Sequence, residues 1–274
     1  MLVDTHCHLN FEIFAQDLDA ILERARREGL ARILNPGVDL PSSRAAIGLA
    51  EVYPEVYAAV GVHPNDAMSW DASTLSELRE LARHPKVRAI GEIGLDDYRQ
   101  RAPRDIQERI FRQQLELAAE AGLPVVVHVR NAGPEDRRAV EDALDILTAW
   151  QGELSAHTTP LAERPGVLHS FSDKLDMARR AIAMNFWIGI TGPVTFRKAE
   201  ETQKVVAGFP LENLLAETDA PFLTPDPHRG KRNEPSYVRF VVEKIAQIKG
   251  QAPERVADVT SANAERLFNW QAIH

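Results

Sequence analysis

Cysteine is almost absent from the chain, and so are the long apolar runs that mark secreted or membrane proteins. Cys7 is the single cysteine among 274 residues, so no intrachain disulfide holds the fold together, which is typical of proteins in a reducing compartment. No apolar run approaches the roughly 18 residues that a membrane-spanning helix requires. The N-terminal segment has no basic region followed by an apolar stretch, so we expect no signal peptide, no membrane contact and a cytoplasmic location.

A surplus of positive charge is also missing. The formal net charge is -8, whereas proteins that bind long nucleic acid through a broad basic face are positively charged. Any contact with nucleic acid must therefore be local, at a site where metal ions and a few basic side chains outweigh the overall negative charge.

What the chain does contain is a regular alternation of two kinds of segment. Short apolar, β-branched stretches alternate with longer amphipathic ones, which predicts parallel strands joined by helices. The length suits one barrel, and no repeat or linker divides the chain. We therefore predict an α/β protein, a single (β/α)8 TIM barrel that forms one domain over residues 1–274. The expected strands are Met1–Thr5, Ala31–Leu34, Tyr57–Val60, Val87–Ile90, Pro124–Val127, Gly166–Leu168, Asn185–Ile190 and Leu214–Glu217.

The amphipathic segments predict helices between these strands and two closing helices after them. Pro253 suits the first turn of the last helix. The least regular stretch, Gln151–Pro165, has two prolines and little periodicity, so we expect a long loop before the sixth strand. The expected helices include Asp17–Glu28, Thr74–Ala82, Asp105–Ala121, Glu135–Trp150, Lys174–Ala183, Ser236–Ile248 and Pro253–Phe268.

Histidines and carboxylates stand at the predicted strand ends. His6 and His8 close the first strand, and because they are two residues apart, both point to one side in extended geometry. The C-terminal ends of the strands converge on the active site of a TIM barrel, so such side chains face one another there. The full set is four imidazoles and two carboxylates: His6, His8, Glu92, His128, His169 and Asp219.

This donor set predicts a centre for two divalent metal ions. Imidazole with carboxylate suits zinc, manganese, iron or nickel better than calcium, and magnesium stays on the list of candidates. Six ligands are too many for one catalytic ion that keeps an open position, whereas two ions that share a carboxylate use all six. Taken singly, a histidine after a strand is more often a structural residue, and Glu92 is equally a cap or a surface acid. The set favours metal because structural histidines would scatter over both ends of the barrel.

The remaining histidines fall into two groups. His63 also follows a predicted strand. His84 looks like a helix terminus, and His157, His228 and His274 lie in loops or the tail, so we assign these four no metal role.

Eight short motifs, in order along nearly the whole chain, resemble those of the TatD family of metal-dependent deoxyribonucleases, within the wider amidohydrolase-like superfamily. One such motif would be weak evidence, but eight in order are specific. They are DTHCHL (Asp4–Leu9), GVHP (Gly61–Pro64), GEIGLD (Gly91–Asp96), VVVHVR (Val125–Arg130), LHSFS (Leu168–Ser172), GPVTF (Gly192–Phe196), ETDAP (Glu217–Pro221) and RGKRNEP (Arg229–Pro235).

The resemblance implies a role for each matching residue. His6, His8 and Asp219 resemble the ligands of a first metal, and His128 and His169 those of a second. Glu92 resembles a carboxylate that bridges the two ions, and His63 resembles a residue at the substrate phosphate. We also expect Asp219 to act as the general base.

The reaction expected from this site is hydrolysis of DNA phosphodiester bonds by a metal-activated hydroxide. The resemblance implies 3′-to-5′ exonuclease action and a link to DNA repair. A concave, narrow mouth favours single-stranded or frayed ends, and nothing indicates an obligate protein partner. We expect Arg130, Arg229, Lys231 and Arg232 to hold the substrate, although an RGKR run is more often a solvated turn.

The sequence departs from the family in three places around the mouth. The segment between His128 and His169 is longer than usual, with the surplus near Gln151–Pro165, and two single residues differ. Asp97 stands where the family often has tyrosine, and Val129 stands where serine is common. Two alternatives to the nuclease interpretation stay open. The same metals would polarise a carbonyl group, as in hydrolysis of an amide or of the ester in aminoacyl-tRNA. A metal-loaded barrel could also serve as a binding or scaffold protein, although the complete ligand set argues against this.

Overall fold

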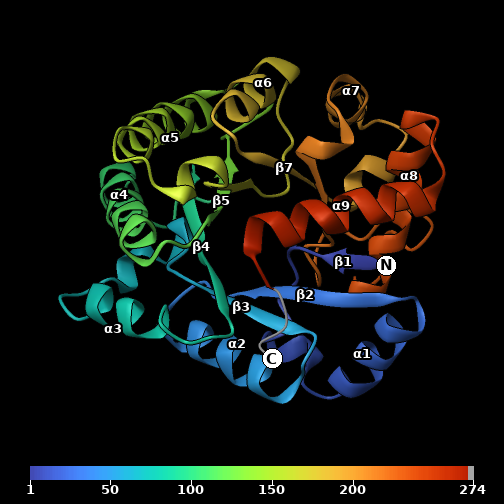
Figure 1. Ribbon diagram of the computed structural model, residues 1–274, viewed down its shortest axis with the longest axis horizontal. Coiled ribbons are helices and arrows are strands. Elements are labelled where there is room, and N and C mark those ends of the chain that lie inside the picture. Colours follow the sequence, from blue (N-terminus) through green and yellow to red (C-terminus); the bar gives the residue numbers. More distant parts are fainter. Residues whose placement is uncertain (271–274) are drawn as a thin grey trace.

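Eight parallel strands, paired in the order in which they occur along the chain, form the centre of the computed structural model, which describes residues 1–270 (Figure 1). The strands are β1 Leu2–Asp4, β2 Leu30–Pro36, β3 Val56–Val60, β4 Val87–Asp96, β5 Val125–Arg130, β6 Gly166–Leu168, β7 Trp187–Ile190 and β8 Leu214–Ala216. The backbone N–H of Thr5 donates to the carbonyl of Ala216 at 3.3 Å, and Cys7 forms a parallel bridge with Ala220. These contacts bring β8 against β1, so the predicted TIM barrel is confirmed. His274 lies outside the described residues.

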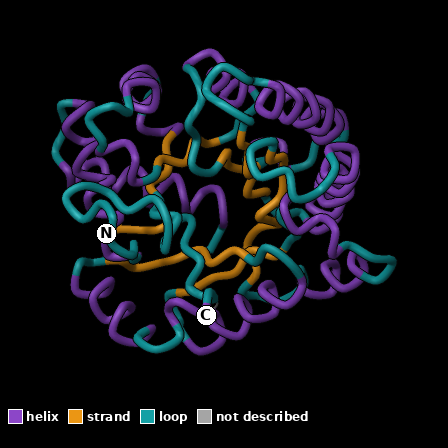
Figure 2. Tube along the Cα trace, turned by 180° about the vertical axis from the view of Figure 1, so that it is seen from behind, coloured by secondary structure: helices purple, strands orange, loops and turns teal. Residues whose placement is uncertain are grey.

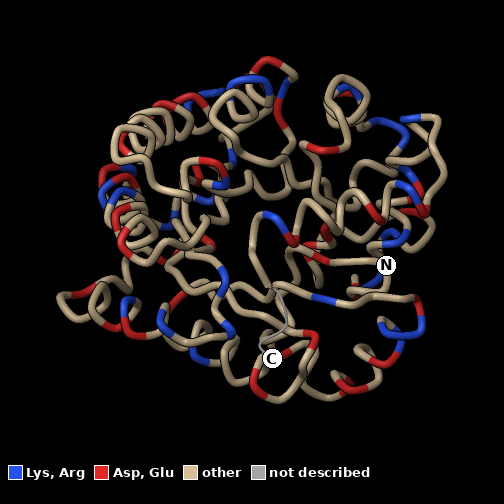
Figure 3. The backbone as a smooth tube through the Cα atoms, viewed as in Figure 1, with Lys and Arg blue, Asp and Glu red and all other residues tan. Residues whose placement is uncertain are grey.

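Helices surround the barrel and follow the strands in alternation. Their acidic and basic residues are interspersed rather than gathered into one basic face in the view of Figure 3. No helix in the described part of the chain has the length and apolarity needed to cross a membrane. The helices are α1 Leu18–Arg27, α2 Leu40–Val52, α3 Thr74–Leu81, α4 Arg104–Ala121, α5 Arg138–Ala156, α6 Leu175–Ala183, α7 Glu200–Gly208, α8 Val238–Lys249 and α9 Pro253–Phe268.

Two cores lie on opposite faces of the sheet. In β3, Val56, Ala58 and Val60 pack outward under the helices, whereas Tyr57 and Ala59 point into the barrel. This is the alternation that an extended strand imposes.

One end of the barrel is closed by the C-terminal helix. Leu267, Phe268 and Trp270 belong to the same buried cluster as the inward-facing Val3 and Tyr57. Figure 1 shows α9 crossing in front of the strands, and Figure 2, from behind, shows loops around the other end. The C-terminal strand ends therefore open on the face opposite α9.

The predicted loop at Gln151–Pro165 is wrong for most of its length. Helix α5 continues through Ala156, and a short 3-10 turn covers Pro160–Glu163. Leu154 continues the buried helical stripe, and the side chain of Gln151 donates to the carbonyl of Ala162 at 2.8 Å, so both stabilise the longer helix. Helices α2 and α7 were not among the helices expected, whereas α9 begins at Pro253 as predicted.

Candidate metal centre

The end of β1 is tied to the segment that follows β8. Asp4 is buried and accepts hydrogen bonds from the backbone N–H of Thr218 at 2.9 Å and from its hydroxyl at 2.6 Å. Burial raises the pKa of Asp4 to about 8, despite the hydrogen bonds from Thr218. The N–H of Asp219 donates to the carbonyl of His6 at 2.8 Å. Two distant segments thus present His6, His8 and Asp219 side by side.

Glu92 reaches the barrel interior because β4 is irregular. Ile90 and Ile93 both pack outward and pair with Val125 and Val127, so two residues of β4, at 91 and 92, lie opposite one residue of β5. Without this bulge, strict alternation would put Glu92 on the same face as Ile90. Glu92 was predicted just beyond its strand; it lies inside β4, and His128 likewise lies inside β5, because both strands run further than the sequence indicated.

Glycines let β4 pass this close to β5. At Gly94, where φ is 141°, an added Cβ would lie 1.9 Å from the carbonyl oxygen of His128. At Gly91, with φ at 157°, it would lie 2.7 Å from Cβ of Val126. Only glycine fits both the space and the positive φ, so the bulge that presents Glu92 depends on these two residues.

One group of donor atoms gathers around Oε2 of Glu92. The Nε2 atoms of His6 and His8 are 3.2 Å apart, and they lie 3.4 and 3.6 Å from this oxygen. Oδ1 of Asp219 is 3.7 Å from His6 Nε2 and 3.5 Å from His8 Nε2. A tetrahedral site with metal–ligand bonds of about 2.0–2.2 Å has ligand atoms roughly 3.3–3.6 Å apart. The spacing therefore fits a single divalent ion.

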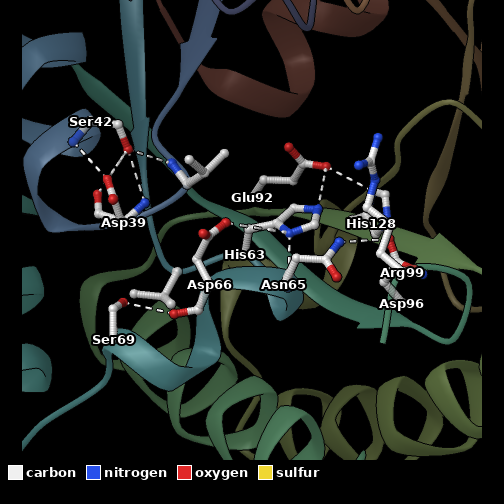
Figure 4. Close-up of polar contacts among 12 residues, drawn as sticks. Asp39, Ser42, His63, Asn65, Asp66, Ser69, Glu92, Asp96, Arg99 and His128 are labelled. Atoms are coloured by element: carbon white, nitrogen blue, oxygen red, sulfur yellow. Dashed lines mark hydrogen bonds and ion pairs between the residues drawn. The ribbon is translucent and has the colours of Figure 1, made fainter. Parts of the chain in front are cut away.

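A second group surrounds the other oxygen of the same carboxylate. Oε1 of Glu92 lies 2.9 Å from Nδ1 of His128, 3.2 Å from Nε2 of His169 and 3.6 Å from Nε2 of His63. Figure 4 shows Glu92 between His63 and His128. The structure thus brings the six expected donors together, and it places His63 beside Glu92 as well.

The carboxylate and the imidazoles of this cluster shift one another's pKa values. Burial raises the pKa of Glu92, but the charges of the imidazoles around it outweigh burial, so its pKa lies well below the ordinary value. Burial, followed by the nearby ring of His169, lowers the pKa of His6. The Nδ1 atoms of His6 and His8 are buried and have no hydrogen-bond partner among residues 1–270.

Burial lowers the pKa of His128 and of His169, but contacts with Asp96, Glu92 and Glu217 outweigh burial and raise both pKa values above the ordinary value. A divalent ion that binds these two rings must therefore displace protons from them, so metal binding should depend on pH.

Three residues behind the donors were not assigned from the sequence. Oδ2 of Asp96 lies 3.1 Å from Nε2 of His128 and accepts a hydrogen bond from the side chain of Asn65 at 2.8 Å. Oε1 of Glu217 lies 3.4 Å from Nδ1 of His169. Asp96 stands at the end of β4, beyond the predicted end at Ile90, so a correct strand end would have pointed to it. Glu217 already ended the predicted strand Leu214–Glu217 and was not assigned a role.

A cavity of about 680 Å³ opens above these donors. The basic side chains that line it are not all the ones expected from the sequence. Arg130 lines it as predicted, together with Arg99 and Arg101, which the sequence did not indicate. Arg229, Lys231 and Arg232 are not among the lining residues. The guanidinium of Arg229 lies 4.1 Å from the ring centre of Phe196.

Arg232 has a structural partner instead. Its guanidinium pairs with Asp17 at 2.5 Å and donates to the carbonyl of Ile13 at 2.8 Å. Of the two single residues that depart from the family pattern, Val129 lines the cavity, whereas Asp97 pairs with Arg104 at 2.5 Å.

Comparison with known proteins agrees with the barrel architecture and with a metal-dependent hydrolase. The family described as TatD related DNase matches residues 3–269. A relative from Bacillus subtilis, named an uncharacterized metal-dependent hydrolase YabD, is 43% identical over 98% of this chain and 99% of its own. A relative from Escherichia fergusonii, named 3′-5′ ssDNA/RNA exonuclease TatD, is 36% identical over 97% of this chain and 98% of its own.

A solved structure resembles the whole fold as well. The crystal structure of YjjV, a TatD homolog from Escherichia coli K12, superposes with a TM-score of 0.88 at 31% identity and covers 98% of each chain. The match to the family extends from β1 to the residue after α9, so it includes every candidate donor. The chain therefore belongs to the TatD family and is a metal-dependent hydrolase.

Proposed function

We propose that this hydrolase is a deoxyribonuclease that removes nucleotides from the 3′ ends of single-stranded or frayed DNA. The observation that carries the proposal is one carboxylate, Glu92, whose two oxygens face two adjoining groups of imidazoles at the floor of an arginine-lined cavity. A shared carboxylate is typical of centres that hold two ions for phosphodiester cleavage. The 3′-to-5′ polarity rests on the name of the Escherichia fergusonii relative, which also includes RNA.

Two ions would divide the donors between them. His6, His8, Asp219 and Oε2 of Glu92 would hold one ion, and His128, His169 and Oε1 of Glu92 would hold the other. When bound, such ions supply Lewis acidity, which lowers the pKa of a water molecule and neutralises negative charge on phosphate oxygens. The candidates are zinc, magnesium, manganese, iron and nickel.

His63 is arranged to donate a hydrogen bond into the cavity. Its Nδ1 accepts from the backbone N–H of Asn65 at 3.0 Å, so in the neutral ring the proton resides on Nε2. Burial, and next the ring of His128, lower the pKa of His63 to about 3, which keeps the imidazole neutral. Nε2–H faces the side of Glu92 and is suited to a non-bridging phosphate oxygen.

Asp219 is the group proposed to take a proton from the attacking water. Burial raises the pKa of its carboxyl, but contact with His8 and the charges of neighbouring histidines lower the pKa below the ordinary value. Asp219 is therefore ionised at neutral pH and can accept a proton at a carboxylate oxygen.

The arginines explain how an acidic protein would hold a polyanion. Arg99, Arg101 and Arg130 are exposed on the cavity wall, and within residues 1–270 neither Arg99 nor Arg101 forms an ion pair with a carboxylate. Together with bound dications, these guanidinium groups would give a local positive potential in a chain whose net charge is -8. The proposal includes a footprint of only a few phosphates, with Arg229 and Lys231 as outer contacts. It further includes action as one domain in the cytoplasm, without an obligate protein partner, and a part in DNA repair.

The proposal is tested by comparing substrates on one preparation whose metal content is measured. Single-stranded DNA, duplex DNA, aminoacyl-tRNA and a simple aryl phosphodiester are incubated with protein reloaded with each candidate metal. We expect nucleotide release from single-stranded DNA to have the highest kcat/KM and to stop on chelation. Faster deacylation of aminoacyl-tRNA than cleavage of DNA would replace the proposal with the carbonyl-hydrolase alternative.

A further inference from the structure

A large aromatic side chain stands open to solvent at the rim of the metal cavity. Half of Phe222 is exposed, although exposed rings of this size are uncommon, and its neighbour Leu223 is 37% exposed. Both residues line the cavity. The mechanism proposed above uses neither of them. An exposed apolar ring beside the polar metal centre is suited to bind a ligand that has an apolar face.

The backbone under Phe222 is fixed in place. Its N–H donates to the carbonyl of Asp219 at 2.8 Å, and its own carbonyl accepts from the side chain of Asn233 at 2.6 Å. The same amide group of Asn233, which is fully buried, donates to the carbonyl of Thr218 at 2.9 Å. The ring is thus attached by a tight turn to a proposed metal ligand, so its position relative to the donors is set before a substrate arrives.

A second aromatic ring extends this surface toward the donors. Phe11 stacks on His8 with ring centres 4.5 Å apart and an angle of 19° between the planes. Phe222 meets Phe11 edge to face, with the ring centres 6.0 Å apart and an angle of 74°. Phe11 also lines the cavity. The two rings therefore form a continuous apolar wall that begins at His8 and ends at the rim.

We infer that Phe222, supported by Phe11, is a stacking surface for a nucleobase next to the scissile phosphate. The inference rests on the proposed function and deepens it. A nucleotide combines a flat apolar base with a phosphate, and this cavity combines an aromatic wall with the cationic wall of Arg99, Arg101 and Arg130. Because every base has a π face, such a surface holds any base, but only one that is not paired in a duplex.

The test compares ordinary short DNA strands with strands in which the last two 3′ nucleotides lack bases. Stacking on an aromatic side chain contributes about 1–3 kcal/mol per base, which corresponds to roughly 5- to 150-fold. We expect wild-type holoenzyme to prefer ordinary strands in KM by a factor in this range. Phe222→Ala and Phe222→Leu should lose most of the preference, whereas Phe222→Trp should keep it. Val52→Ala, which removes an exposed apolar side chain on α2, is the matched control and should behave as wild type.

A binding measurement separates the two proposals. A strand with 2-aminopurine at its 3′ end and phosphorothioate linkages, which slow cleavage, should lose fluorescence on binding to wild type and to Phe222→Trp, because stacking quenches this base. Quenching should be much weaker with Phe222→Ala. Equal quenching and an undiminished preference in Phe222→Ala would overturn the stacking inference alone. If metal-loaded wild type neither cleaves nor binds any strand, the proposed function fails first and the inference falls with it.

Discussion

Glu217 lies directly behind His169, on the opposite side of the ring from Glu92. Its Oε1 is 3.4 Å from Nδ1 of His169, while Nε2 of the same ring is 3.2 Å from Glu92. Glu217 is fully buried and also accepts from the hydroxyl of Thr5 at 3.2 Å. A carboxylate behind a histidine fixes the orientation of the ring and leaves the other nitrogen free for a metal.

Replacing this carboxylate by an amide should weaken metal binding. We expect Glu217→Gln to lower the affinity for divalent metal about 10- to 100-fold, since removal of such supporting groups typically has this effect. Competition against a fluorescent chelator measures the affinity. Glu212→Gln, an exposed residue nearby in sequence, is the control and should bind as wild type. Unchanged affinity in Glu217→Gln would mean that Glu217 has a packing role only.

Asp219 is proposed to do two things, and one substitution separates them. Asp219→Asn keeps an oxygen ligand but removes the base, so we expect kcat to fall about 10²- to 10⁴-fold, far more than metal occupancy falls. Elemental analysis and steady-state kinetics on the same samples provide both numbers. Asp226→Asn, an exposed neighbour that does not line the cavity, is the matched control. Equal and modest losses of rate and metal would leave Asp219 as a ligand only.

The salt dependence of DNA binding should show which basic side chains contact phosphates. Each phosphate neutralised on a single strand adds about 0.7 to the slope of log affinity against log salt, so we expect a wild-type slope on the order of two to three. Arg99→Ala with Arg101→Ala should reduce the slope by about one to two units, because both side chains line the cavity. Arg229→Ala with Lys231→Ala should reduce it less, since neither residue does. The reverse order would restore the 229–232 segment as the principal phosphate contact.

Glu234 should make stability depend on pH in a predictable direction. Burial raises its pKa, but hydrogen bonds from Arg24, at 2.6 and 2.9 Å, and from Ser236 lower it below the ordinary 4.5. The stabilisation from a lowered acid pKa is present above the unfolded value and is lost as pH falls through the folded value.

Glu234→Gln should therefore destabilise the protein at pH 7 by about 1–2 kcal/mol, a modest value because Arg24 is partly exposed. The difference from wild type should shrink as pH falls below about 4.5. Urea unfolding of both proteins in chelator, from pH 7 to pH 3.5, measures it. A difference that grows toward low pH would contradict the assignment.

The convergence of the donors could be predicted because it follows from strand order. Parallel strands place their C-terminal ends at one edge, and short apolar stretches mark where strands begin. The alternation of an extended chain was enough to predict that His6 and His8 lie together, as the structure shows. The inward position of Glu92 could not be predicted from alternation alone, because it depends on the bulge in β4. The sequence indicates this bulge only by the glycines at 91 and 94.

Contacts between distant parts of the chain could not be predicted. The run from Arg229 to Arg232 looked available for phosphate, but Arg232 pairs with Asp17, 215 positions earlier. The path of the chain after β4, which brings Arg99 and Arg101 to the cavity, depends on tertiary structure rather than on a local pattern. The two prolines in Gln151–Pro165 led to the prediction of a loop. Burial of Leu154 instead extends α5 into this segment.

The most direct test of two ions acting on a phosphodiester is a titration of metal-free protein with Mn²⁺. Bound metal and the release of nucleotides from single-stranded DNA are measured on the same samples, for wild type and for Glu92→Gln. We predict that cleavage stays near background while the first equivalent binds, rises with the second, and saturates near two ions per chain. Glu92→Gln should neither hold two ions nor cleave, because a neutral amide bridges two dications poorly. Full cleavage at one ion per chain, or no cleavage with two ions bound, would contradict the account.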